Sequence, residues 1–434
     1  MLAEILSVFL IVLVCFSPHA HCETKKNQEQ QTDREESPDS LQAYPEKLPS
    51  TLKWEKIVNV PGRIIHTPFL LTIMGAAKIA EKIDDTKIIP KVKYYYSVYW
   101  PEGFSVKYSS RHGGGLSYSN KFSSFHNTSR FEVAVQRGVR DRGYYCLRLI
   151  DWRPFGKKYS TDLTFYNRFL SDESFFGIGN ESKFSGENNY ALNQSVAEMS
   201  FKVLISGKLN MGARLGFDMN DVEKGKDSSL PYTTDLYNEE QLTGLEEKTR
   251  TTRVQVELKY NSINRMKRPT AGLLFFLNGS IYNDLEHDNY AFRKYTASYR
   301  QFFHVKYNRT FSLRFAFERT QPVSGKKVPF YYLSELGETE TIRGFRRGRF
   351  RDNDMMLGSL EYRYPIWREW LDAGLFIDAG QVSPNLLERF SGNDFHYGYG
   401  GALKVWGKDS RKMQLMVGRS SDMTRYYFSW NEEF

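Results

Sequence analysis

The chain has 434 residues, with 60 Lys and Arg against 51 Asp and Glu, which gives a formal net charge of +9. Aromatic residues make up 15% of the chain, yet the hydrophobic share is only 40% and the mean hydropathy is −0.55. These values exclude a helical membrane protein. They suit membrane strands that turn one apolar, aromatic face to lipid and one polar face to a lumen.

Residues 1–22 are predicted to be a signal peptide. An uninterrupted apolar run extends from Ile5 to Phe16, which is too short for a spanning helix and has the length of a signal-peptide core. Small and polar residues follow, so cleavage after Ala20 or Cys22 fits the pattern, and lipidation of Cys22 is the alternative. Export makes nucleic acid a poor partner for the surplus positive charge, and the phosphates of lipopolysaccharide are the more natural one.

Two segments precede the strands. Residues 23–50 are rich in Glu, Gln, Lys and Pro and almost devoid of apolar side chains, so we expect a disordered periplasmic leader. Residues 51–88 contain an amphipathic helix beginning after Pro68, because apolar residues recur there at three- and four-residue steps. This helix has three possible positions: it plugs the lumen, lies on the inner leaflet or caps the barrel.

From residue 90 to residue 434 the hydrophobic period changes to two, as in strands. The segments run about 9 to 12 residues, the length of a tilted membrane strand. Tight turns such as Ser206–Lys208 alternate with long polar loops such as Asn220–Lys248. This pattern predicts an all-β, transmembrane antiparallel β-barrel of about 16 strands; the alternative is a large soluble β-sandwich or propeller. The clearest alternating sets are Val92 to Trp100, Phe131 to Val135, Leu209 to Phe217, Val254 to Tyr260, Leu273 to Leu277 and Phe311 to Phe317.

The chain ends in a strand whose aromatic residues share one face. Tyr426, Phe428, Trp430 and Phe434 are in phase, and the last of them is the final residue. An aromatic-ended final strand resembles the signal by which barrel proteins are handed to their assembly machinery. The C-terminal strand is therefore a candidate recognition site for that machinery.

The most specific stretch runs from Tyr331 to Val382. It closely resembles the barrel of the BamA/TamA assembly-factor superfamily, also called the bacterial surface antigen family, and the similarity covers about residues 90 to 434. Three ordered motifs carry the resemblance, and they are Ile342-Arg343-Gly344-Phe345, Leu360-Glu361-Tyr362-Arg363-Tyr364-Pro365 and Phe376-Ile377-Asp378-Ala379-Gly380. The upstream segment Phe175 to Asn180 and the terminal Phe434 support it.

The residues themselves give a separate argument for a polar site in the lumen. Apolar residues of both segments occupy alternate positions, so Glu361 and Asp378 must point inward. Two inward carboxylates are costly unless they are paired, and the preceding loop supplies Arg343. Bidentate pairing of a guanidinium with carboxylates is the natural solution.

The resemblance implies that this loop folds back into the lumen, where Arg343 contacts Glu361 and Asp378. We call these three residues the lumenal lock. Gly344 lets the loop tip turn closely against the wall. Two further residues, Phe345 and Gly380, belong to the same family motifs. The alternative is a solvated basic loop, and the four outer arginines are expected to contact either lipid phosphates or water; they are Arg346, Arg347, Arg349 and Arg351.

No catalytic motif stands out, since HExxH, GxSxG and a Walker loop are all missing. We expect neither an enzyme nor a cofactor or metal site. Full members of the superfamily carry periplasmic POTRA modules, and only about 68 residues lie between the signal and the first strand, so we expect a member that consists of the barrel with at most a leading helix. The Gly398 to Gly401 cluster lies in a strand pattern, where close backbone approach explains it.

Two functional hypotheses follow from the sequence. In the first, the seam between the strands near Val92–Trp100 and Arg425–Phe434 opens, or the bilayer thins, to insert or transport protein or lipid. In the second, the barrel is a passive narrow pore or a structural surface protein whose lumen is plugged. The expected location is the bacterial outer membrane. The expected partners are its lipid and lipopolysaccharide, unfolded outer-membrane protein or lipid clients, and the barrel assembly machinery, with no nucleic acid.

Overall fold

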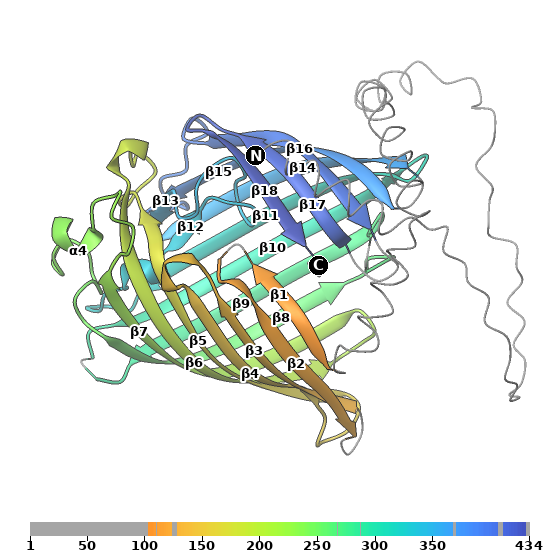
Figure 1. Cartoon of the computed structure of the whole chain (residues 1–434), viewed down its shortest axis with the longest axis horizontal. Coiled ribbons are helices and arrows are strands. Elements are labelled where there is room, and N and C mark those ends of the chain that lie inside the picture. The colour runs from red at the N-terminus through yellow and green to blue at the C-terminus, as the bar shows by residue number, and fades with distance from the viewer. Residues whose placement is uncertain are drawn as a thin grey trace, which may run out of the picture. The chain divides into compact units, whose positions relative to one another are not determined.

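The computed structural model describes residues 103–109, 111–123, 128–266, 268–286, 288–367, 370–406 and 411–430. The predicted signal peptide, leader and amphipathic helix lie outside these residues, as does the strand expected over Val92–Trp100. The described part is all-β, and sixteen antiparallel strands follow one another around a barrel in sequence order (Figure 1). This confirms the predicted fold class.

The strands of the barrel differ in length from six to seventeen residues. The first eight are β1 (Phe104–Ser109), β2 (Gly113–Ser123), β3 (Thr128–Arg137), β4 (Gly143–Trp152), β5 (Tyr159–Phe175), β6 (Asn188–Leu204), β7 (Leu209–Lys224) and β8 (Thr249–Asn261). The others are β9 (Gly272–Asp284), β10 (Ala291–Val305), β11 (Arg309–Pro322), β14 (Asp354–Trp367), β15 (Leu371–Ser383), β16 (His396–Trp406), β17 (Arg411–Arg419) and β18 (Thr424–Trp430).

Short elements lie in the connections. The strands β12 (Ser334–Leu336) and β13 (Phe350–Asp352) pair with each other between β11 and β14. The helical segments are η1 (Val139–Asp141), η2 (Phe184–Gly186), α4 (Thr233–Leu236) and η3 (Phe330–Tyr332). In the described part of the chain, no helix has both the length and the apolar character needed to cross a membrane.

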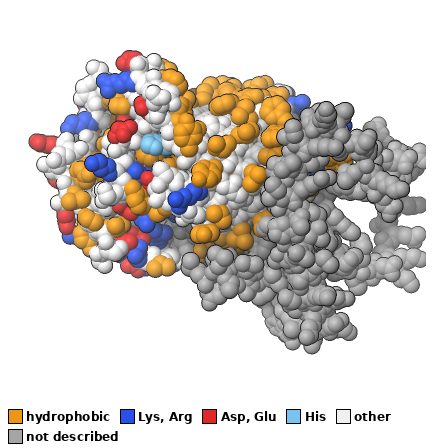
Figure 2. All heavy atoms as spheres, turned by 90° about the horizontal axis from the view of Figure 1, so that it is seen from above, with side chains coloured by type: hydrophobic (Ala, Val, Ile, Leu, Met, Phe, Trp, Pro, Cys, Tyr) orange, Lys and Arg blue, Asp and Glu red, His pale blue; other side chains and the backbone are white. Residues whose placement is uncertain are grey.

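Along the barrel strands, apolar side chains mostly face outward, and most of the polar ones face inward. In β8, Val254 and Val256 are about half exposed, whereas Gln255 and Glu257, which alternate with them, are buried. Figure 2 shows the resulting orange belt of hydrophobic side chains on the barrel wall, next to an end where charged side chains gather. Exposed apolar surface on this scale marks a membrane-facing wall.

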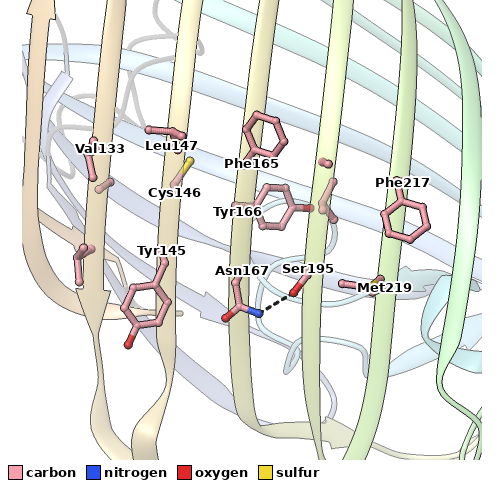
Figure 3. A pocket seen from close by; sticks show the side chains of 14 residues that line it. Val133, Tyr145, Cys146, Leu147, Phe165, Tyr166, Asn167, Ser195, Phe217 and Met219 are labelled. Carbon is pink, nitrogen blue, oxygen red and sulfur yellow. Dashed lines mark hydrogen bonds between the residues drawn. The ribbon is translucent and has the colours of Figure 1, made fainter.

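A shallow hollow of about 450 Å³ interrupts the wall over β3 to β7. Apolar side chains such as Phe165 and Phe217 line it (Figure 3). Asn167 faces the hollow as well, and its amide donates to the hydroxyl of Ser195 and to the side-chain oxygen of Asn193, both at 2.9 Å. These polar groups satisfy one another, as polar groups away from water must.

The connections alternate between short and long. The predicted tight turn Ser206–Lys208 joins β6 to β7. The prediction that a long loop begins at Asn220 was wrong, because β7 continues to Lys224, which pairs with Tyr190 of β6. Most of the last residues of β7 are polar because they extend beyond the apolar belt. Their backbone still pairs with β6.

Candidate functional site

The connection between β11 and β14 folds back against the inner wall of the barrel. Its tip residues Ile342 and Phe345 are fully buried. They belong to a buried apolar cluster that consists of Ala316, Leu336, Ile342, Phe345, Phe350, Met355, Leu357 and Val382. This confirms the prediction that the loop folds back into the lumen. The buried apolar cluster holds the loop against the inner wall.

Arg343 at the loop tip joins both predicted carboxylates. Its guanidinium binds Asp378 in a bidentate manner, with Nε to Oδ2 at 2.7 Å and Nη2 to Oδ1 at 2.6 Å. Nη1 donates to Glu361 at 3.1 Å, and Nη2 also donates to the hydroxyl of Ser359 at 3.0 Å. The backbone amide of Arg343 donates to Asp378 as well, at 3.0 Å. The three residues of the lumenal lock thus come together as predicted.

The surroundings hold the lock in its charged state. Asp378 is fully buried, and Glu361 is shared with Lys404, a residue that the sequence analysis missed. The guanidinium of Arg343 lies 3.6 Å from the centre of the Phe376 ring, a favourable position for a cation. Burial opposes the charge of Arg343, but the hydrogen bonds and negative charges of Asp378 and Glu361 raise its pKa above the ordinary value.

The loop tip is also bonded to the last hairpin of the barrel. The Gly344 amide donates to the hydroxyl of Tyr427 on β18 at 3.0 Å, and the Ser420 hydroxyl donates to the Gly344 carbonyl at 2.9 Å. Gly344 has φ +95°, and a Cβ there would meet the backbone of Arg419 and Ser420. Gly398 of β16 leaves room for the Arg343 carbonyl in the same way, which confirms the close backbone approach expected there.

Gly380 lies in β15 above the lock. A Cβ at this position would be 3.0 Å from Leu336 and 3.1 Å from the Met356 carbonyl. Leu336 belongs to β12 and is fully buried. The glycine of the third motif therefore makes space for the folded-back loop and touches none of the charged groups.

Each of the four outer arginines pairs with a carboxylate, so the alternative of contact with water only was wrong, and contact with lipid phosphates stays a prediction. Arg349 donates to Asp422 at 2.6 Å and Arg351 to Glu335 at 2.8 Å. Arg351 is 3% exposed, and a charge so deep in the protein requires a partner. The other two pairs are Arg346 with Glu187 and Arg347 with Glu338.

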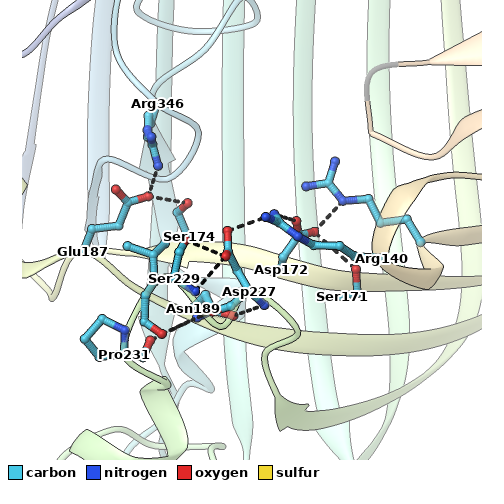
Figure 4. Close-up of polar contacts among 12 residues, drawn as sticks. Arg140, Ser171, Asp172, Ser174, Glu187, Asn189, Asp227, Ser229, Pro231 and Arg346 are labelled. Atoms are coloured by element: carbon cyan, nitrogen blue, oxygen red, sulfur yellow. Dashed lines mark hydrogen bonds and ion pairs between the residues drawn. The ribbon is translucent and has the colours of Figure 1, made fainter.

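Two of these pairs connect the loop to other connections, since Glu187 lies between β5 and β6 and Asp422 between β17 and β18. Figure 4 shows Arg346 reaching Glu187, which also accepts a hydrogen bond from Ser174. In the same region, Arg140 pairs with Asp172 at 2.9 Å and with Asp227 at 2.8 Å. The long connections are thus tied together by two separate groups of charged contacts, one around Glu187 and one around Asp172.

Tyr426 and Phe428 share one face of β18, as predicted, and this face is turned outward. Tyr426 is 61% exposed and Phe428 is 42% exposed, which fits a lipid-facing position. The side chain of Trp430 and the residue Phe434 lie outside what the structure describes. Their part in a C-terminal recognition signal stays a prediction.

A second buried carboxylate cluster escaped the sequence analysis. Asp372 on β15 is fully buried and binds Arg268 from the turn between β8 and β9, with Nε to Oδ2 at 2.9 Å. The indole of Trp406 donates to the same oxygen at 2.7 Å. Alternation along β15 places Asp372 on the same inward face as Asp378. The same alternation in the sequence could therefore have predicted that Asp372 points inward.

The chemistry that these residues offer is that of a clamp. Among the described residues, no group of three or more His, Cys, Asp and Glu side chains could hold a metal ion. What the site provides is a bidentate, charge-assisted connection between a long loop and the inner wall. Such a connection holds two parts of a structure in one arrangement.

The fold and the clamp together define a class: outer-membrane-type β-barrels whose lumen holds a folded-back, arginine-anchored loop. The profile of the Omp85 superfamily domain matches residues 125–407, and the chain belongs to the Omp85 superfamily. This confirms the family drawn from the motifs. No curated protein matches the chain.

Solved structures that resemble the chain include one with a TM-score above 0.5. BamA from Haemophilus ducreyi lacking POTRA domains 1-3 is 16% identical over 75% of this chain and 69% of that chain, with a TM-score of 0.55. CdiB from Escherichia coli is 13% identical over 75% and 61% of the two chains, with a TM-score of 0.47. CdiB from Acinetobacter baumannii is 11% identical over 74% and 58%, with a TM-score of 0.44. The likeness to BamA concerns the fold alone.

Proposed function

We propose that this protein is an assembly or translocation factor of the bacterial outer membrane, which inserts or transports protein or lipid clients there. The apolar outer wall supports the proposal that the barrel lies in the outer membrane, and we propose that residues 23–50 form a leader in the periplasm. Membership of the Omp85 superfamily supports this class of activity. The proposal includes no enzymatic step and no cofactor. Its partners are outer-membrane lipid and lipopolysaccharide, unfolded clients, and the barrel assembly machinery that inserts the chain itself.

One observation carries the proposal. The loop tip is bonded on one side to β14 and β15, through Arg343, and on the other side to the last hairpin, through Gly344. β18 and β1 are the two ends of the strand order, so any opening of the barrel between its first and last strands moves β18 relative to the wall. The lock is therefore placed to control that movement.

The test is a client-folding assay with the full-length protein in liposomes. A small, urea-unfolded barrel is the client, and its folding is followed by the shift in gel migration without heating. We expect faster folding than in empty liposomes and loss of this gain in Arg343→Gln. Arg140→Gln is the matched control, because Arg140 also pairs with two carboxylates but lies away from the lock. Equal folding rates with and without the protein contradict the proposal.

The second candidate is a passive narrow pore or structural surface protein. The buried loop cluster inside the barrel favours it, since a packed loop leaves little open path. Conductance in planar bilayers separates the two. A large, steady conductance that Arg343→Ala leaves unchanged, together with no gain in client folding, supports a passive pore and contradicts control by the lock.

A further inference from the structure

Alternate connections of the barrel lie at the same end, because neighbouring strands are antiparallel. At one end, called the turn end, strands β4 to β11 are joined by residues 153–158, 205–208, 262–271 and 306–308. At the opposite end, called the loop end, the same strands are joined by residues 176–187, 225–248 and 285–290. The charge of the two ends can therefore be compared over the same part of the barrel.

The two ends differ in the sign of their charge. The turn-end connections read RPFGKK, ISGK, SINRMKRPTA and KYN, and in them eight residues are Lys or Arg and none is Asp or Glu. The loop-end connections of the same strands contain ten Asp or Glu and three Lys or Arg. The sequences that connect β14 to β15 and β16 to β17 each contain one basic and one acidic residue. The basic surplus therefore belongs to one side of the barrel, at the turn end.

Three lysines of two neighbouring turns are available to an outside anion. Lys157, Lys158 and Lys208 are exposed, and within the described residues none of them forms an ion pair. The amide of Leu204 donates to the carbonyl of Lys158 at 3.0 Å, so the two turns lie next to each other. Their positive charge has no partner of its own in this part of the structure.

Exposed lysines at the loop end differ in this respect. Each of three such lysines pairs with a carboxylate at 2.7 or 2.8 Å, and the pairs are Lys224 with Asp235, Lys226 with Asp141 and Lys248 with Asp221. An anion near the loop end thus meets lysines that are already neutralised and a surplus of acidic residues. The turn end is the end that attracts anions.

Apolar side chains lie beside the three unpaired lysines. Phe155, in the same turn as Lys157, is 73% exposed, and Ile205, in the same turn as Lys208, is 55% exposed. A lysine reaches along an apolar surface with its methylene stem and keeps its ammonium group at the polar boundary. Exposed apolar residues mixed with lysines are typical of surfaces that enter the headgroup region of a membrane.

We propose that the turns at residues 153–158 and 205–208 bind the anionic headgroups of phospholipids in the periplasmic leaflet of the outer membrane. The inference rests on the membrane location proposed above, and short turns of outer-membrane barrels face the periplasm. An acidic segment of an unfolded client would also match the charge. A lipid surface fits better, because the exposed apolar wall continues from these turns into the strands, through Tyr159 of β5 and Leu204 of β6.

The test measures which lipids contact the barrel. Full-length protein is reconstituted into vesicles of dimyristoyl phosphatidylcholine with a trace of spin-labelled phosphatidylglycerol, which is anionic, or of spin-labelled phosphatidylcholine, which is zwitterionic. Electron paramagnetic resonance separates lipid immobilised at the protein from free lipid. The two spectra give the association constant of phosphatidylglycerol relative to that of phosphatidylcholine.

Three variants locate the effect. The first, Lys157→Gln/Lys158→Gln/Lys208→Gln, removes the unpaired lysines of the turn end, and the corresponding Arg variant keeps their charge. The matched control, Lys224→Gln/Lys226→Gln/Lys248→Gln, removes the same charge from exposed lysines of the loop end. Heat-modifiable gel migration checks that every variant folds.

We expect the wild type to select phosphatidylglycerol about twofold or more at low salt, averaged over all lipids around the barrel. A single lysine near an anionic membrane surface changes binding by about fivefold, and this local effect is diluted by lipids elsewhere on the wall. The selectivity should fall toward one in the turn-end Gln variant and persist in the Arg variant and the loop-end control. Salt at about 1 M shortens the screening length to about 3 Å and should abolish the selectivity of the wild type.

Equal association of the two lipids with the wild type at low salt overturns the proposal, and so does a loss in the loop-end control as large as that in the turn-end Gln variant. A turn-end Gln variant that keeps its lipid selectivity but slows client folding assigns the turns to clients and is equally contrary. If the chain does not fold into the vesicles, the proposed membrane location fails together with this inference. A protein that selects phosphatidylglycerol but accelerates no client contradicts only the assembly activity.

Discussion

Truncation of Arg343 removes the central charge of the lumenal lock. In Arg343→Ala the fully buried carboxylate of Asp378 loses both side-chain bonds from the guanidinium, and keeps only the Ser359 hydroxyl at 2.6 Å and the backbone amide of residue 343. Glu361 keeps its pairing with Lys404. The substitution therefore leaves one buried negative charge without a cation.

Breaking a buried ion pair by removing one partner costs about 3–5 kcal/mol. We expect the free energy of unfolding of Arg343→Ala, measured by urea titration in lipid or detergent, to fall by this amount. Replacing both partners by apolar residues leaves no orphaned charge, so the double variant Arg343→Met/Asp378→Leu should recover much of the loss. The single variants and the double variant together form a thermodynamic cycle that isolates the pair.

The control for this cycle is Arg346→Ala. The side chain of Arg346 is 36% exposed in its pair with Glu187, and such a pair contributes only about 0–1 kcal/mol. A coupling energy between Arg343 and Asp378 no larger than about 0.5 kcal/mol, the level of independent sites, would refute a buried clamp. An Arg343→Ala loss equal to that of Arg346→Ala would lead to the same conclusion.

Further predictions concern the loop and its neighbours. Gly344→Ala forces a Cβ into the left-handed region against the backbone of the β17–β18 turn; it should lower the unfolding free energy by about 1–3 kcal/mol, and an unchanged urea midpoint contradicts this. Tyr427→Phe removes one hydrogen bond to the loop tip; it should cost at most about 1.5 kcal/mol yet reduce client folding, and full activity contradicts control through β18. Asp372→Ala leaves Arg268 buried without its partner, and urea titration should show a loss of about 3–5 kcal/mol; a loss under about 1 kcal/mol contradicts the role of this pair. Burial raises the pKa of Asp352 to about 6, above an unfolded value of about 3.9. The folded state therefore binds the proton more tightly, and stability from this group is present below about pH 4 and is lost as the pH rises through about 6. Asp352→Asn should match the wild type at pH 4 and exceed it at pH 7, and a difference independent of pH contradicts this.

Strand alternation was sufficient to place the two carboxylates of the lock. Glu361 and Asp378 lie in phase with inward positions of their strands, and a period of two is fixed by backbone geometry alone. Arg343 required more, because nothing local says where a long loop goes. The family motif supplied that information, and the structure confirms it.

The remaining contacts depend on the register between neighbouring strands. Alternation along a single strand gives no information about that register. Lys404 meets Glu361 because β14, β15 and β16 are staggered by a specific amount. Arg268 and Asp372 are 104 positions apart and meet only because the barrel curves.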